Sequence, residues 1–202
     1  MAILGGFFKG YLELCSMYPD VIPMKGCVIF SILIFFLLTS CELLFEEPKS
    51  ELAKLPHISQ SGDWNFGCLV NGKANVVYNS MLMRAETRGN QFLFSFNKTE
   101  DNRVWSDEIS AVRFELIEPL SIDVPYSLTL DSLFKAEYTE YENNNPICIY
   151  KPEQVYSGEI TFSRIDRTQF IIAGTFNFTA ENDSCQKLEV TEGRFDIHYF
   201  PY

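Results

Sequence analysis

The chain has 202 residues and a formal net charge of −11, with 27 acidic and 16 basic side chains. A protein this acidic lacks the positive surface that nucleic-acid binding requires, so we expect no nucleic-acid partner. Hydrophobic residues make up 47% of the chain and aromatic residues 15%, which excludes extensive disorder and indicates a globular protein.

An apolar segment near the start of the chain predicts export. Lys25 precedes an apolar run over residues 28–38, which ends in small residues and Cys41. The run is too short to cross a bilayer, which takes about 20 residues, and it suits a signal peptide. The small residues before the cysteine resemble the lipobox of bacterial lipoproteins, in which the thiol is acylated, for example with palmitate. We therefore predict a signal-peptide region over residues 1–40 and lipidation of Cys41; an ordinary signal peptide and a buried helix are the alternatives.

The flanking segments define the domain organisation. The signal peptide is complete from Met24, so we predict that translation begins there; the alternative is an unusually long leading region. Residues 41–60 carry scattered charges and no sustained period, which indicates a lipid-anchored tether. Its Glu46-Glu47 pair belongs either to a solvated linker or to an acidic signal of the kind that some Gram-negative bacteria use for surface lipoproteins. Residues 61–202 then form a single β-domain.

Alternation with a period of two begins after Gly62 and indicates β-strands. Apolar residues alternate on both sides of Asn71-Gly72, a dipeptide that favours a two-residue hairpin turn, and Ala74, Val76 and Tyr78 form the expected apolar face of the second strand. Three phenylalanines, at positions 92, 94 and 96, form an aromatic stripe on a later strand. Further strands are expected around Phe114, and at Leu128 and Leu130. The polar segment 137–145 is expected to form a loop.

The C-terminal third has the clearest strand pattern. Gly174 lies in the middle of an alternating run, which predicts a bulge or a close backbone approach. The parity of the apolar residues changes between Val190 and Phe195, which predicts a bulge at Gly193. We therefore predict an all-β fold, an antiparallel sandwich of about 8–10 strands, with a closed up-and-down β-barrel as the alternative.

Four segments also carry a resemblance. They are GEITF at 158–162, IAGTFNFTA at 172–180, VTEGRFDI at 190–197 and NFGCLVNGK at 65–73. Together they resemble a family of Gram-negative lipoproteins catalogued only as a domain of unknown function. The likeness covers both ends of the domain, and the middle is generic. It implies a small β-domain anchored by lipid to the outer membrane, on its periplasmic or cell-surface face, and it brings no catalytic or ligand residues.

Residue types that could carry catalysis are sparse. His57 and His198 are the two histidines, and neither has the partners at the spacing that a zinc site needs. The sequence holds no Gly-x-Ser-x-Gly motif and no phosphate-binding loop. Carboxylate pairs such as Asp107-Glu108 are typical of solvated loops. We expect no catalytic residue, no metal site and no cofactor.

Aromatic residues in or beside predicted loops are candidates for stacking on sugar rings. If they gathered on one rim they would suit a glycan; ordinary packing at the ends of the sandwich is the alternative. The candidates are Trp64, Trp105, Tyr138 and Tyr141, with Tyr150 and Tyr156 in similar places. Separately, the triplet Asp131-Ser132-Leu133 resembles an acceptor pattern for bacterial O-glycosylation at Ser132.

Three cysteines follow Cys41 in the sequence. A protein that is exported, as predicted here, enters an oxidising compartment in which accessible thiols tend to form disulfides. Cys68 has the parity of Phe66 and is expected in the core as an inert thiol. Cys148 and Cys185 both lie beside turns, near strand ends. We predict a Cys148–Cys185 disulfide and a free Cys68, with three free thiols as the alternative.

These observations favour a non-catalytic module of the bacterial cell envelope. We expect a monomer that is held at the membrane by its N-terminal lipid and binds a glycan or an envelope protein. A β-barrel carrier of a small apolar ligand is one alternative, in which the phenylalanines would line a cavity. A hydrolase with an unrecognised carboxylate pair is another.

Overall fold

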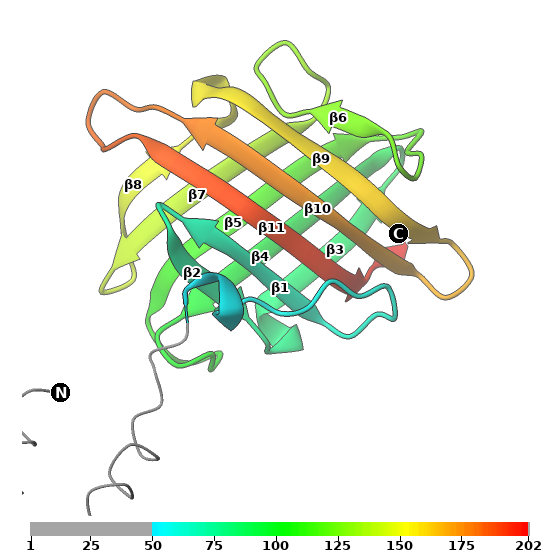
Figure 1. The fold of residues 1–202 in the computed structure, drawn as a ribbon, viewed down its shortest axis with the longest axis horizontal. Coiled ribbons are helices and arrows are strands. Elements are labelled where there is room, and N and C mark those ends of the chain that lie inside the picture. Colours follow the sequence, from blue (N-terminus) through cyan, green and yellow to red (C-terminus); the bar gives the residue numbers. More distant parts are fainter. Residues whose placement is uncertain (1–49, 202) are drawn as a thin grey trace, which may run out of the picture. The chain divides into compact units, whose positions relative to one another are not determined.

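Two six-stranded β-sheets lie face to face in the computed structural model, which describes residues 50–201 (Figure 1). The strands are β1 (Asn65–Val70), β2 (Lys73–Val77), β3 (Met83–Arg88), β4 (Gln91–Thr99), β5 (Glu108–Ile117), β6 (Pro125–Ser127), β7 (Lys135–Glu142), β8 (Asn145–Tyr150), β9 (Val155–Asp166), β10 (Ile171–Ala180), β11 (Leu188–His198) and β12 (Phe200–Pro201). The first sheet has the order β2-β1-β11-β10-β9-β6 and the second β12-β3-β4-β5-β7-β8. Neighbouring strands are antiparallel, except that β12 pairs with β3 in parallel.

This arrangement confirms the predicted sandwich. Each sheet has two edge strands, so the sheets do not close on each other and the barrel alternative is wrong. The strand number exceeds the prediction because β6 and β12 are only three and two residues long. Strands that short leave no alternating run in the sequence.

Phenylalanine rings from both sheets fill the space between them. Phe66 on β1 stacks on Phe96 of β4 with ring centroids 4.0 Å apart, and Phe114 on β5 meets the edge of Phe176 on β10 at 4.9 Å. All four side chains are almost fully buried. Burying a side chain of this size contributes about 1.5–3 kcal/mol, so these rings account for much of the stability of the domain. They pack against one another and do not line the cavity that an apolar carrier would need.

Two predicted irregularities are present in the first sheet. The register between β9 and β10 shifts at Gly174, where a Cβ atom would collide with the carbonyl oxygen of Thr161. The extra residue of β11 is Glu192, with φ of 54°, one position before the predicted Gly193. Gly193 itself is required because a Cβ there would lie 2.5 Å from the carbonyl oxygen of Phe176.

Two predicted segments differ from the structure. Leu128 and Leu130 do not form a strand: β6 ends at Ser127, Leu128 is buried in the core and Leu130 is 55% exposed. The expected loop at 137–145 is instead the β7–β8 hairpin. Its turn residues Asn143 and Asn144 both have positive φ, as the two-residue hairpin turn with the favoured twist requires. The charged and amide side chains that suggested a loop are exposed or half-buried, and most of them lie near the tip of this hairpin.

Residues 50–63 precede β1 and pack on the first sheet; we call them the N-terminal strap. They begin with a short 3₁₀-helix, η2 (Leu52–Lys54), and place Leu55 in contact with the sheet at 8% exposure. The predicted tether extended to Gln60, whereas the described residues 50–60 pack on the first sheet. The sequence pattern missed this segment because it packs through isolated contacts and not through a periodic face.

The carboxylate of Asp196 on β11 holds the strap in place. It is fully buried and accepts hydrogen bonds from the Ser59 hydroxyl at 2.7 Å and from the backbone N–H groups of Ser61, Gly62 and Asp63 at 2.9, 2.8 and 3.3 Å. Both carboxylate oxygens are therefore satisfied by the segment that they anchor.

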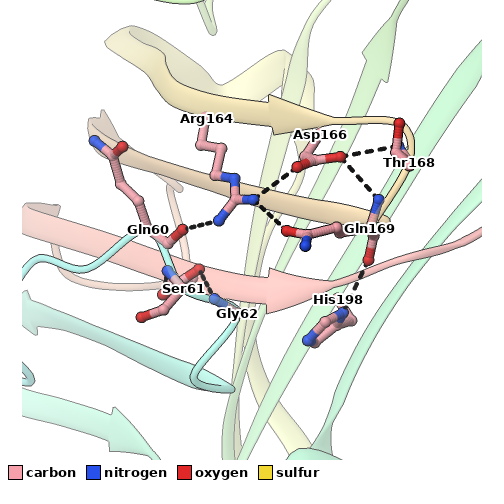
Figure 2. Close-up of polar contacts among 9 residues, drawn as sticks. Gln60, Ser61, Gly62, Arg164, Asp166, Thr168, Gln169 and His198 are labelled. Carbon is pink, nitrogen blue, oxygen red and sulfur yellow. Dashed lines mark hydrogen bonds and ion pairs between the residues drawn. The ribbon is translucent and has the colours of Figure 1, made fainter.

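A second polar cluster ties the strap to the β9–β10 turn (Figure 2). Arg164 donates to the backbone oxygen of Gln60, to the carboxylate of Asp166 at 2.6 Å and to the side chain of Gln169 at 2.5 Å. The Asp166 carboxylate also accepts the backbone N–H of Gln169 at 2.8 Å, and His198 lies 3.3 Å from the Gln169 carbonyl oxygen. The bond from Arg164 thus fastens the strap to the end of β9, and the remaining bonds brace Arg164 and His198 against the β9–β10 turn.

The predicted signal peptide over residues 1–40, the start at Met24 and the lipidated Cys41 lie outside the described residues. Within residues 50–201, no helix is long and apolar enough to cross a membrane.

Candidate functional site

A hollow between the two sheets has a volume of about 790 Å³. It lies where β2, at the edge of the first sheet, faces β5, β7 and β8 of the second, and the loop between β10 and β11 forms one wall. We call it the inter-sheet cleft. The lining residues that matter below are Asn75, Lys98, Ser110, Tyr138, Glu140 and Cys148.

Two hydrogen bonds cross from sheet to sheet at the base of the cleft. The Asn75 side-chain amide on β2 donates to the Ser110 hydroxyl on β5 at 2.7 Å, and the Lys98 ammonium on β4 donates to the Ala74 carbonyl oxygen at 3.2 Å. Asn75 is only 5% exposed, and its side-chain oxygen has no hydrogen-bond partner in the structure. A buried acceptor without a partner costs about 1–3 kcal/mol, so a hydrogen bond from a water molecule or from a ligand would stabilise this atom.

A disulfide holds the wall of the cleft. Cys148 on β8 is joined to Cys185 in the β10–β11 loop, with the Cα atoms 6.2 Å apart, and Cys68 is a buried free thiol. This is the pairing that the sequence predicted. Two hydrogen bonds add to the crosslink: Tyr150 donates to the Gln186 carbonyl oxygen at 2.5 Å, and Asn182 donates to the Ile149 carbonyl oxygen at 2.8 Å. The loop is therefore fixed to β8, beside which it lies in Figure 1.

The charge in the cleft differs from that of the whole chain. Lys73, Lys98 and Glu140 line it, so basic groups outnumber acidic ones in a protein with a net charge of −11. Burial lowers the pKa of Lys98, because desolvation disfavours its charged form. A negatively charged group brought beside this ammonium would offset part of that desolvation.

Burial also keeps two neighbouring groups protonated. Desolvation raises the pKa of Cys68 to about 12, so its thiol is protonated and unreactive at neutral pH. Desolvation, followed by the charge of Glu140, raises the pKa of Tyr138, whose hydroxyl therefore remains a hydrogen-bond donor. Glu140 is the one carboxylate that lines the cleft, so the cleft does not offer the facing pair that a glycosidase of the common kind requires.

The predicted stacking residues do not gather on one rim. Tyr138 lines the cleft but is 4% exposed, and Tyr150 beside it is 3% exposed. Trp64 stacks near His198, with ring centroids 5.6 Å apart, at the strap. Tyr141 lies on the other face of the second sheet, beside Arg113, and Trp105 projects from the β4–β5 loop with 96% of its surface exposed. Tyr138 and Tyr150 thus pack in the core, whereas Tyr141 and the half-exposed Tyr156 lie outside it, and the tryptophans belong to two separate parts of the surface.

The other predicted positions are also separate from the cleft. Ser132 lies half-buried in the β6–β7 loop, where its hydroxyl oxygen accepts the backbone N–H of Phe134 at 3.0 Å. His57 is exposed in the strap, far in sequence from His198. Among residues 50–201 there is no group of three or more His, Cys, Asp or Glu side chains that could hold a metal ion.

A second, smaller hollow of about 310 Å³ lies on the outer face of the second sheet. Its carboxylates already have partners within the protein: Glu86 pairs with Arg84 and Arg88, and Glu137 pairs with Arg113. The hollow therefore lacks the unsatisfied group that distinguishes the inter-sheet cleft.

Comparison with known protein families identifies the family of this chain. A family model described as a domain of unknown function (DUF6252) matches residues 70–196. The chain belongs to this family. The match extends from the end of β1 almost to the end of β11, and so includes every cleft residue named above. It also includes the middle strands, in which the sequence segments quoted above showed no resemblance to the family. No curated protein and no solved structure shows significant similarity to the chain.

Sequence reasoning missed Asn75, although a signal was present. A two-residue turn at Asn71-Gly72 pairs Cys68 with Asn75, and residues that pair directly share one face of the sheet. Because Cys68 points into the core, so does Asn75. The predicted apolar face of this strand, Ala74, Val76 and Tyr78, is therefore wrong in phase, and Tyr78 is 59% exposed. Lys98 and Ser110 carried no such signal, because only the packing of the sheets brings them to Asn75.

Proposed function

We propose that the protein is a non-catalytic binding module of the bacterial cell envelope, held at the outer membrane by a lipid on Cys41. It acts as a monomer and takes its ligand in the inter-sheet cleft. The observation that carries the proposal is the buried Asn75 oxygen without a partner, at the base of a cleft of about 790 Å³.

The groups in the cleft define the ligand's chemistry. The Asn75 oxygen accepts a hydrogen bond, which a hydroxyl group supplies. The Lys98 ammonium makes one hydrogen bond in the structure, to Ala74, and has donors left for an acidic group. Exposed Ile109 and Ile147 at the lining add apolar surface. A hydroxylated ring with a carboxylate meets all three requirements, so the ligand class is an acidic sugar, free or within a glycan.

Calorimetric titration of the purified chain with uronic acids, and with the matching neutral sugars, tests this proposal. The acidic sugars bind and the neutral ones bind at least about tenfold more weakly, because the Lys98 contact is lost. Lys98→Met removes this preference, whereas Lys135→Met, on the outer face of the second sheet, leaves it unchanged. Binding of neither class, or binding that Lys98→Met does not alter, overturns the proposed cleft.

The anchor is tested separately. Cys41→Ala leaves the precursor unprocessed and without fatty acid, which mass spectrometry and incorporation of labelled palmitate both report. Incorporation of fatty acid by this variant overturns the anchor while leaving the cleft untouched.

A further inference from the structure

Four large exposed side chains gather at the end of the sandwich where the described chain begins. They are Leu52 on η2, Tyr78 after β2, Met81 on the 3₁₀-helix η3 (Ser80–Leu82) and Trp105 in the β4–β5 loop. Their exposed fractions are 51%, 59%, 76% and 96%. Tryptophan and methionine are usually buried, so two such side chains left almost uncovered indicate a surface that meets something else.

Hydrogen bonds hold the segments that carry these side chains together. The Tyr78 hydroxyl donates to the Lys54 carbonyl oxygen at 3.2 Å, which joins β2 to η2. The Asn79 side chain caps η3 by accepting the Met81 N–H at 3.0 Å, and it donates to the Asn102 carbonyl oxygen at 3.0 Å, which joins η3 to the β4–β5 loop. The four apolar side chains thus belong to one continuous end of the domain, which we call the strap end.

The chain that leads into the domain arrives at the strap end. Figure 1 shows η2, the first described element, beside β2. Ser50 follows Cys41 by nine residues, which span at most about 30 Å when fully extended. This step depends on the lipid anchor proposed above: if Cys41 carries the lipid, the strap end is the part of the domain nearest the bilayer.

The charges at the strap end are partly neutralised. Glu51 pairs with Lys54, and Asp101 pairs with Arg103. Glu100 and Asp107 form no ion pair among the described residues, which favours a zwitterionic over an anionic surface. Tryptophan and tyrosine prefer the interface between water and lipid, where the ring is half-solvated.

We infer that the strap end is a membrane-docking surface, in which Trp105 and Met81 insert into the headgroup region of the bilayer that holds the anchor. Docking would orient the domain against the membrane, whereas a lipid alone would leave it free to tumble on its nine-residue connection.

Fluorescence of the full acylated chain in phosphatidylethanolamine vesicles tests this inference. Trp64→Phe leaves Trp105 as the single tryptophan. With a lipid brominated near its headgroup, we expect Trp105 emission to fall at least about twofold, because an interfacial ring contacts the bromine.

The matched control places the single tryptophan elsewhere on the domain. Both native tryptophans are replaced by Phe, and Leu133→Trp introduces a new one in the β6–β7 loop, where Leu133 is 67% exposed. The emission of this tryptophan should not be quenched by the brominated lipid.

The outcomes separate the anchor from the docking surface. If the chain does not float with the vesicles, the anchor fails, and the docking inference falls with it. If the chain floats but Trp105 is quenched no more than the Leu133→Trp probe, the anchor stands and the docking surface is overturned. Loss of Trp105 quenching on Met81→Ser would support a shared insertion site, and unchanged quenching would overturn the role of Met81.

Discussion

Two clusters of buried polar groups lie at different places in the sandwich, and they differ in how completely they are satisfied. Asp196, beneath the N-terminal strap, receives hydrogen bonds on both carboxylate oxygens from Ser59 and three backbone N–H groups. Asn75, at the base of the inter-sheet cleft, uses its amide nitrogen and leaves its oxygen without a partner. A satisfied cluster stabilises the fold, whereas an unsatisfied one beside a hollow is suited to a ligand.

The disulfide at the wall of the cleft should give the largest change in stability. Replacing both Cys148 and Cys185 by Ser opens a crosslink between residues 37 apart, which the chain-entropy model values at about 3–4 kcal/mol. Urea unfolding without reductant measures the loss. Cys68→Ala is the control: reductant should destabilise this variant as it does the wild type, and should have no effect on the double variant. A double variant as stable as the wild type would show that the crosslink contributes nothing.

Asp196→Asn should have the next largest effect. The amide keeps one acceptor oxygen but turns a donor towards backbone N–H groups of the strap, so we expect a loss of about 2–3 kcal/mol in the free energy of unfolding. Ligand binding in the cleft should not change. Asp63→Asn, at an exposed carboxylate in the same strap, should stay within about 0.5 kcal/mol of the wild type. If both variants cost the same, the buried carboxylate does not hold the strap.

Asn75→Leu should reverse this pattern. Leucine has a similar volume and removes both the unsatisfied oxygen and the hydrogen bond from the amide nitrogen to Ser110. The loss of that one hydrogen bond should lower the free energy of unfolding by about 0.5–1.5 kcal/mol, less than for Asp196→Asn. Binding of an acidic sugar should fall at least about tenfold, since the ligand hydroxyl loses its acceptor. Calorimetry measures the affinity, and urea unfolding of the same sample measures the stability. A large loss of stability with unchanged affinity would make Asn75 a structural residue like Asp196.

The smallest effect concerns pH and the strap. Hydrogen bonds from the Gln169 backbone and from Arg164 lower the pKa of Asp166 in the folded protein. Because the folded-state pKa is lowered, the carboxylate stabilises the protein at a pH above its unfolded pKa of about 4. This contribution decreases below that pH and is lost as the pH falls through the folded-state pKa. Asp166→Asn should therefore be less stable than the wild type at neutral pH, with a gap that closes on acidification. A gap that is constant from neutral to acidic pH would contradict this origin.

Local sequence patterns determined much of this protein. Alternation and the Asn71-Gly72 turn predicted the first hairpin, and the parity change after Val190 predicted the β11 bulge to within one residue, because both follow from the two-residue period of a strand. The same parity placed Cys68 in the core. The pairing of Cys148 with Cys185 followed from their places beside turns, and the structure has the same pair.

Only the tertiary structure decided which side chains of one sheet meet which side chains of the other. Asn75, Lys98 and Ser110 come from β2, β4 and β5, and their meeting depends on how one sheet lies on the other, which no local period specifies. The strap was likewise hidden, since it binds Asp196 through backbone N–H groups that every sequence possesses. The aromatic residues that suggested a sugar-binding rim were dispersed by the same packing, because a side chain's distance along the chain says little about its neighbours across a sandwich.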